Sequence, residues 1–186
     1  ALLTGLLVYV LAHIVTDDRR VALAAVVLLA VTPGHAFRTS LGYADHHAFD
    51  YFWLTLTALS LTALFTADRD RPVTAPWTWL AAAGIGVGVS GQVLAWDNGP
   101  LLAVPVGIAV ALGTLADLRA GRSPLRTKVP VLAGLALAAL VTFGIHETVD
   151  WHTTTVAVTP ALLFAGSFAV VAVGEAAARL DRDARE

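Results

Sequence analysis

Residues 38–47 of this chain read Arg-Thr-Ser-Leu-Gly-Tyr-Ala-Asp-His-His, and they separate an apolar run that ends near Phe37 from another that begins near Ala48. This short stretch contains a guanidinium, a carboxylate and two imidazoles. Polar groups at a membrane boundary are costly to desolvate, so such a cluster is a candidate functional site. The runs on either side indicate what kind of molecule carries it.

The composition predicts an integral membrane protein. The 186 residues are 57% hydrophobic and 14% charged, and the mean hydropathy is +0.73, outside the range of ordinary soluble domains. The formal charge of -2 gives no support to nucleic-acid binding. The absence of Cys excludes disulfides and thiolate metal sites. Because the sequence contains no Met and starts inside an apolar run, we expect it to be a piece of a longer protein.

Seven apolar runs are candidates for transmembrane helices, because a helix needs about twenty apolar residues to cross a bilayer, and at least about seventeen. Pro33 and Gly34 predict a kink or an early stop in the second run. The sequence therefore predicts an all-α, polytopic transmembrane helix bundle that occupies residues 1–186 as a single domain. The expected helices cover residues 1–15, 21–37, 45–66, 77–95, 101–115, 129–145 and 153–174, before a charged, helix-prone tail at 175–186.

The distribution of positive charge predicts the orientation of the bundle. Loops 16–20, 67–76 and 116–128, together with the tail, hold eleven of the twelve Lys and Arg residues. Arg38 is the exception and lies on the other side. Because short cytoplasmic loops are enriched in Lys and Arg, we expect a plasma-membrane protein with loop 38–47 on the extracellular face and the C-terminus in the cytoplasm.

Asp45 and His47 form a candidate metal site, since Asp-x-His supplies a carboxylate oxygen and an imidazole nitrogen. This donor set suits a divalent transition ion such as Mn²⁺ better than an all-carboxylate Mg²⁺ site does. In the alternative interpretation, Asp45 is the N-cap of the third helix, and His46 and His47 are solvated at the interface. The spacing leaves both interpretations open.

Arg38 is the second candidate. A guanidinium can bind a phosphate through two parallel hydrogen bonds, or balance a carboxylate beside a metal ion. Alternatively, its side chain extends to the lipid headgroups.

Other polar residues near the same face have weaker claims. Asp50 follows His47 by three residues and could face the same cavity, or lie at the wet boundary. We expect His35 to be a polar group at a helix end, and Trp96-Asp97-Asn98 to be an interfacial anchor followed by a turn. A second metal-capable patch or, preferably, a solvated loop is expected from His146, Glu147, Asp150 and His152. An aromatic belt or the bundle interior is expected for Phe49, Tyr51, Phe52 and Trp53.

The stretch 38–47 resembles the second short acidic motif of the catalytic subunit of oligosaccharyltransferase. In that family an Arg, a Ser, a Gly and an aromatic residue precede Asp-x-Asp, Asp-x-Glu or, in archaeal forms, Asp-x-His. Residues 92–99, Gln-Val-Leu-Ala-Trp-Asp-Asn-Gly, are similar to the segment in which the family ends a helix with Trp and a Gly-containing outer turn. The two segments occur in the expected order with a helix between them.

The resemblance implies a membrane domain of the GT-C glycosyltransferase type. Its activity would be protein N-glycosylation on the outer face of an archaeal cell: transfer of an oligosaccharide from a dolichol-type lipid phosphate or diphosphate to Asn in an acceptor Asn-x-Ser/Thr sequence. The resemblance assigns Asp45 and His47 to a divalent metal, Mn²⁺ or Mg²⁺. It assigns Arg38, with these two residues, to catalysis, and Arg38 and Trp96 to substrate binding.

The sequence departs from the family pattern in three places. It lacks a further acidic motif in the first outer loop, a glutamate-bearing motif in a later outer loop, and a soluble domain with Trp-Trp-Asp-Tyr-Gly. We therefore expect residues 1–186 to be inactive on their own. The competing hypotheses are a transporter or channel, a membrane scaffold without chemistry, and another lipid-phosphate sugar transferase. A transporter should carry polar side chains at mid-bilayer depth, but apart from small Thr and Ser hydroxyls the last four runs offer little beyond Gln92.

Overall fold

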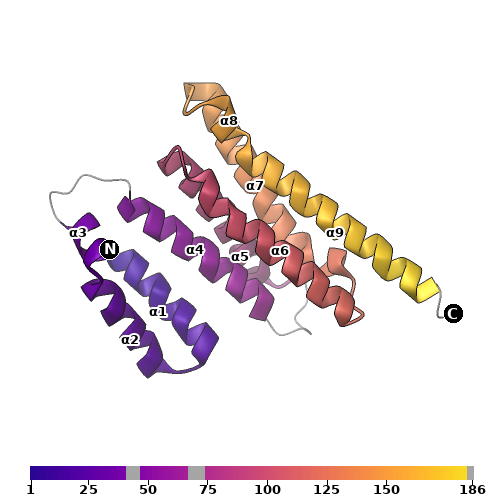
Figure 1. Cartoon of the computed structure of the whole chain (residues 1–186), viewed down its shortest axis with the longest axis horizontal. Helices are drawn as coiled ribbons and strands as arrows, with labels where there is room; N and C mark the ends of the chain where they lie inside the picture. The colour runs from indigo at the N-terminus through magenta and orange to yellow at the C-terminus, as the bar shows by residue number, and fades with distance from the viewer. Residues whose placement is uncertain (41–46, 67–73, 184–186) are drawn as a thin grey trace.

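The computed structural model describes residues 1–40, 47–66 and 74–183, and the regular secondary structure in these ranges is α-helical (Figure 1). This confirms the predicted all-α bundle. The helices are α1 (Leu2–Thr16), α2 (Arg19–Val31), α3 (Pro33–Arg38), α4 (His47–Thr66), α5 (Pro76–Ala95), α6 (Pro100–Arg119), α7 (Pro124–Val149), α8 (Thr154–Ala157) and α9 (Thr159–Asp183).

The helix ends follow local sequence signals. Asp18 caps α2 by accepting a 2.7 Å hydrogen bond from the backbone N–H of Arg20. Ser123 caps α7 in the same way, accepting from the N–H of Arg126. Proline occupies the first position of α3, where its missing N–H costs nothing. Consequently the run expected at 21–37 is interrupted at Thr32, whose backbone is extended, as Pro33-Gly34 predicted.

Four helical segments of the described ranges are long and apolar enough to cross a membrane: α4, α5, α7 and the stretch Thr154–Leu180. Helix α1 is apolar but shorter, and α2 has 13 residues. A span requires at least about seventeen residues, so α2 by itself is shorter than the second of the seven expected spans.

Several helices are longer than the apolar runs. Helix α6 continues to Arg119, α7 covers Pro124–Val149 and α9 reaches Asp183. As a result Lys128, expected in a basic loop, and His146, expected in a polar connection, lie within α7 and are buried. The buried polar side chains in these extensions have partners on neighbouring helices: Lys128 contacts Asp117 of α6, and His146 contacts Thr154 of α8.

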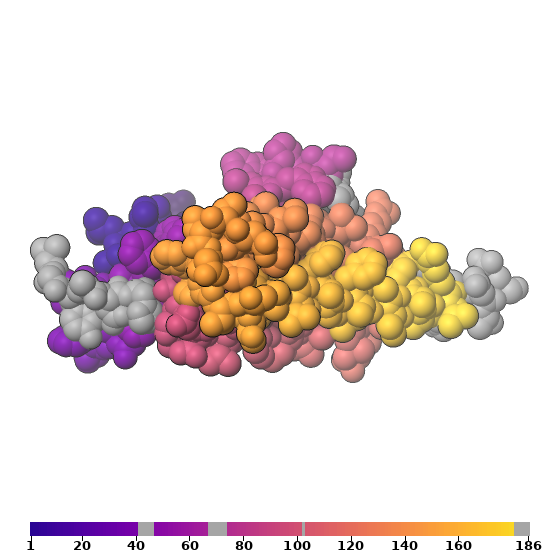
Figure 2. All heavy atoms as spheres, turned by 90° about the horizontal axis from the view of Figure 1, so that it is seen from above, coloured from indigo at the N-terminus to yellow at the C-terminus, as the bar shows by residue number. Residues whose placement is uncertain are grey.

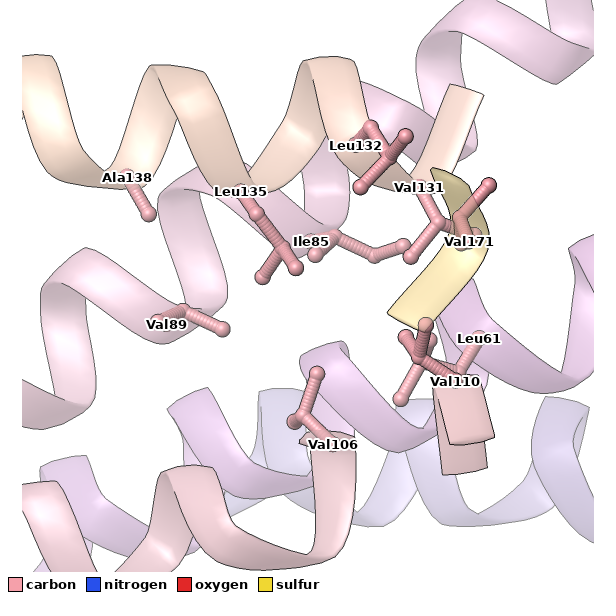
Figure 3. Close-up of a cluster of buried hydrophobic side chains, with 10 residues drawn as sticks. All are labelled: Leu61, Ile85, Val89, Val106, Val110, Val131, Leu132, Leu135, Ala138 and Val171. Atoms are coloured by element: carbon pink, nitrogen blue, oxygen red, sulfur yellow. The ribbon is translucent and has the colours of Figure 1, made fainter. Parts of the chain in front are cut away.

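The helices pack in a connected series. Helix α5 lies between α4 and α7, α7 also packs on α9, α6 packs on α9, and α1 joins α2 to α4. In Figure 2, α9 runs along one side of the molecule and its C-terminal part extends past the neighbouring helices. The buried apolar core lies between α4, α5, α6, α7 and α9 and consists of Leu61, Ile85, Val89, Val106, Val110, Val131, Leu132, Leu135, Ala138 and Val171 (Figure 3).

Glycines bring α5 close to both of its neighbours. A Cβ atom on Gly88 would lie 2.3 Å from Thr57 Oγ1 of α4. A Cβ atom on Gly134 of α7 would lie 2.4 Å from the carbonyl oxygen of Ala82. Small residues allow this close approach in membranes, where dispersion forces rather than the hydrophobic effect hold helices together.

The antiparallel path gathers the loops at two ends of the bundle (Figure 1). We call the end that contains Arg38, His47, Trp96 and His152 the motif end. The opposite end, with the α1–α2 and α6–α7 connections, is the basic end. It contains Arg19, Arg20, Arg119, Arg122 and Arg126. Among the described residues, the predicted separation of Arg38 from the other cations is therefore present in three dimensions.

Candidate functional site

His47 is the centre of the polar cluster at the motif end. It is the first residue of α4, and its Nδ1 lies 3.2 Å from Oδ2 of Asp50. The His47 side chain is 20% exposed and that of Asp50 is 7% exposed. Residues three apart face the same side of a helix, which accounts for this pairing. The pair agrees with the expectation that Asp50 faces the same side as His47.

Trp96 closes the cluster from the end of α5. It directly follows the last residue of that helix and has an extended backbone. Its ring meets the His47 imidazole edge to face, with 5.9 Å between the ring centroids. The structure therefore brings together two predicted site residues that are far apart in the sequence.

Two further rings continue the cluster toward α3. The ring of Tyr51 stacks near His47, with 6.5 Å between the ring centroids, and the centroid of the His35 ring lies 5.3 Å from that of Tyr51. We call His35, Tyr51, His47 and Trp96 the aromatic row. The sequence analysis expected His35 to be a polar group at a helix end and Tyr51 to belong to the aromatic belt or the bundle interior, and it included neither in the candidate site. The four-residue spacing of His47 and Tyr51 is a signal that could have found Tyr51, since such residues are neighbours on a helix surface.

The remaining predicted site residues are Arg38 and Asp45. Arg38 is the last residue of α3 and is half-buried, one turn beyond His35. It forms no ion pair with any other residue that the structure describes. Asp45 and His46 lie outside the described residues.

The geometry of His47 fits a metal ligand. Histidines that bind metals commonly donate the proton of their other ring nitrogen to a carboxylate, which fixes the ring. His47 has this arrangement, with Nδ1 at Asp50. Its Nε2, together with a carboxylate oxygen of Asp45, would provide the mixed nitrogen and oxygen donors that Mn²⁺ accepts. The described residues by themselves contain no group of three or more His, Asp or Glu that could hold a metal ion.

The loop between α7 and α8 is fixed to the end of α5. The indole N–H of Trp151 donates to the carbonyl oxygen of Leu94 at 2.9 Å. The two ring nitrogens of His152 lie 2.5 Å from Asp97 Oδ1 and 3.0 Å from the Leu94 oxygen. These contacts hold the α7–α8 loop next to Trp96 at the end of α5.

The second metal-capable patch does not assemble among the described residues. His146 is buried, and its ring contacts the carbonyl oxygen of Trp151 and the hydroxyl of Thr154. Glu147 and Asp150 are exposed, as expected. The expectation of a loop was wrong at His146 and Glu147, because α7 continues to Val149, and the ring of His146 is buried.

The turn after Trp96 has the expected form. The N–H of Gly99 donates to the oxygen of Trp96 at 2.8 Å, and the N–H of Leu101 donates to the oxygen of Asn98 at 3.0 Å. A Cβ atom on Gly99 would lie only 2.1 Å from the Gln92 carbonyl oxygen. Glycine therefore allows the chain to turn tightly here and to start α6.

The basic end also contains buried charges, but these partner one another. Asp117 accepts hydrogen bonds from Arg122 at 2.6 Å, from Thr127 at 2.5 Å and from the ammonium of Lys128. Burial raises the pKa of Asp117, but these donors together outweigh burial and hold the pKa below its ordinary value. The network joins α6 to α7, and we assign it a structural role.

Comparisons with known proteins match nearly the whole chain. The family model described as "Oligosaccharyl transferase STT3, N-terminal" matches residues 1–180. The chain is 28% identical over 131 residues to dolichyl-monophosphooligosaccharide–protein glycotransferase AglB of Haloferax volcanii. The match covers 63% of this chain and 12% of that protein, so the chain spans only a small part of this relative's length. No solved structure matches.

Proposed function

Because the chain belongs to the oligosaccharyl transferase STT3 family, we propose that it is the part of a protein N-glycosylation enzyme that carries one motif of the catalytic site. The chain is a multi-pass membrane protein of a glycosyltransferase family. The reaction would transfer an oligosaccharide from a dolichol-type lipid phosphate to Asn in an Asn-x-Ser/Thr sequence. The name of the Haloferax relative, a dolichyl-monophosphooligosaccharide–protein glycotransferase, supports a monophosphate donor.

One observation carries this proposal at the level of the site: His47 contacts both the carboxylate of Asp50 and the ring of Trp96. We assign Asp45 and His47 as ligands of a divalent cation, Mn²⁺ or Mg²⁺. When bound, such an ion supplies positive charge that stabilises a phosphate leaving group. Arg38 would bind the lipid phosphate, and Trp96 would pack against the substrate.

The orientation is part of the same proposal. The motif end would face the extracellular side, where the lipid-linked oligosaccharide and the acceptor polypeptide meet, and the basic end would face the cytoplasm. The separation of Arg38 from the cations of the opposite end supports this orientation.

The transporter hypothesis finds no support in the position of Gln92. This residue is 0% exposed and donates a 3.0 Å hydrogen bond to Thr57 between α5 and α4. A polar side chain used in this way joins two helices. We therefore retain the transferase as the proposed function.

The test is transfer of a lipid-linked oligosaccharide to an Asn-x-Thr peptide by the full-length protein, with Mn²⁺ or with a chelator. We expect transfer to require the metal and to be lost in Asp45→Ala. Glu147→Ala removes an exposed carboxylate from the same end and should leave transfer unchanged. If Asp45→Ala transfers normally, Asp45 is only a helix cap. If the unaltered protein transfers nothing where a relative is active, the scaffold and transporter hypotheses move ahead.

A further inference from the structure

Asp50 is a carboxylate that the fold buries close to the start of a membrane helix. It is 5% exposed and lies in the first turn of α4. Burial of a carboxylate is costly unless the charge is paired and hydrogen-bonded. The contact of Asp50 with His47 suggests a function that would account for burying a carboxylate here.

The contact restricts both the protonation and the orientation of the imidazole. A carboxylate only accepts hydrogen bonds, so the His47 nitrogen that faces it must carry a proton. The proton is therefore on Nδ1, and in the neutral ring the lone pair is on Nε2. The rings of Tyr51 and Trp96 also lie beside the imidazole, with their centroids 6.5 Å and 5.9 Å from its own.

We infer that Asp50 is a positioning residue, which holds His47 in the tautomer and orientation that present Nε2 to the divalent cation. This inference rests on the proposed function, in which His47 is a ligand. A carboxylate at position 47 would coordinate a metal without a defined tautomer. The need for Asp50 therefore arises from the use of histidine as the third residue of the Asp-x-His motif.

Asp50→Asn is the most direct test because it keeps the shape of the side chain. An amide can donate as well as accept, so its nitrogen can bond to Nδ1 and move the proton to Nε2, where it would block coordination. We expect Asp50→Glu, which keeps a carboxylate, to retain the original tautomer. Asp97→Asn is the matched control, because Asp97 forms another carboxylate–imidazole contact at this end, with His152.

Two measurements on the full-length protein in lipid nanodiscs separate the possible outcomes. In the metal-free protein, ¹⁵N NMR of labelled histidine reports which nitrogen of His47 carries the proton. We expect Nδ1 in the unaltered protein, in Asp50→Glu and in Asp97→Asn, and a shift toward Nε2 in Asp50→Asn. Mn²⁺ titration followed by electron paramagnetic resonance should show about 10- to 100-fold weaker binding in Asp50→Asn, the usual effect of losing such a partner.

A cycle with His47→Ala distinguishes this inference from the proposed function. His47→Ala should weaken Mn²⁺ binding, and Asp50→Asn added to it should weaken binding no further, because the two residues act as a unit. If Asp50→Asn changes neither the tautomer nor the affinity while His47→Ala still weakens binding, the positioning role is wrong and the ligand stands. If His47→Ala binds Mn²⁺ normally, the ligand assignment fails and the inference fails with it.

Discussion

The side-chain amide of Gln92 donates a 3.0 Å hydrogen bond to the hydroxyl of Thr57, across the contact between α5 and α4. Both residues are buried, with 0% and 2% exposure. The Thr57 hydroxyl donates in turn to the carbonyl oxygen of Trp53 at 2.9 Å. This buried polar side chain near the end of α5 therefore joins the two helices that position Trp96 and His47.

The first prediction is that Gln92 and Thr57 are energetically coupled. Gln92→Leu and Thr57→Val should each destabilise the protein, and the double variant should lose less than the sum of the two losses. We expect a coupling of about 0.6 kcal/mol, with an upper bound of about 1.7 kcal/mol, as for other hydrogen bonds between membrane helices. Unfolding in mixed micelles measures it. Thr57→Val combined with Ser167→Ala, on α9, should be additive, and equal additivity in the first pair would contradict the prediction.

The second prediction concerns the contact between α5 and α7. Gly134→Ala places a Cβ atom 2.4 Å from the Ala82 carbonyl oxygen, so the helices must separate. We expect a loss of about 1–3 kcal/mol in the free energy of unfolding, as for other overpacked sites. Gly144→Ala is the control on the same helix, because no atom lies within 4 Å of the added Cβ. It should be neutral or stabilising by up to about 1 kcal/mol. Equal effects would show that the close approach is unimportant.

The third prediction is that the sole lysine stabilises the fold. Lys128 is 3% exposed, pairs with Asp117, and lies over the ring of Phe65 at 5.4 Å. Removing one partner of a buried pair costs about 3–5 kcal/mol. Because Arg122 still contacts Asp117, we expect Lys128→Leu to cost about 3 kcal/mol, near the lower limit of that range. Arg126→Leu replaces an exposed cation in the same turn and should cost under about 0.5 kcal/mol.

The fourth prediction is a pH dependence from Asp117. Its folded-state pKa is lowered from the ordinary value of 3.8, since the hydrogen bonds from Lys128, Thr127 and Arg122 outweigh burial. A lowered pKa stabilises the fold above the unfolded-state pKa, and this stabilisation is lost as pH falls through the folded-state value. The stability difference between the unaltered protein and Asp117→Asn should thus be constant near neutral pH and shrink below 3.8. A difference that grows on acidification would contradict this assignment.

The fifth prediction concerns orientation, and the absence of Cys from this chain makes it simple to test. Ser40→Cys and Ala120→Cys place single thiols at exposed positions on the motif end and the basic end. In intact cells, and in a background without other reactive cysteines, a membrane-impermeant maleimide should label Ser40→Cys only. Both should react after permeabilisation. Labelling of Ala120→Cys alone in intact cells would invert the proposed orientation.

Local sequence features were enough to predict the all-α fold and several of its details. Apolar runs predicted helices, Pro33-Gly34 predicted the break before α3, and Asp97-Asn98-Gly99 predicted the turn after α5. Each depends on interactions within a few residues, so no long-range information was needed. The helix ends were less predictable, because the side chains of Lys128 and His146 are buried against partners outside their own helix, Asp117 and Thr154.

The candidate site shows the same division. The sequence by itself determined that Arg38 and His46 lie close to the Asp-x-His motif of Asp45 and His47 along the chain. It also determined that Asp50 follows His47 by about one helical turn. Only the tertiary structure decided that Trp96 meets His47, that His35 and Tyr51 extend the row, and that the α7–α8 loop is fixed beside Trp96. Helical periodicity sets which residues share a face, but packing between helices decides which faces meet, and glycines at the α5 contacts set how closely they approach.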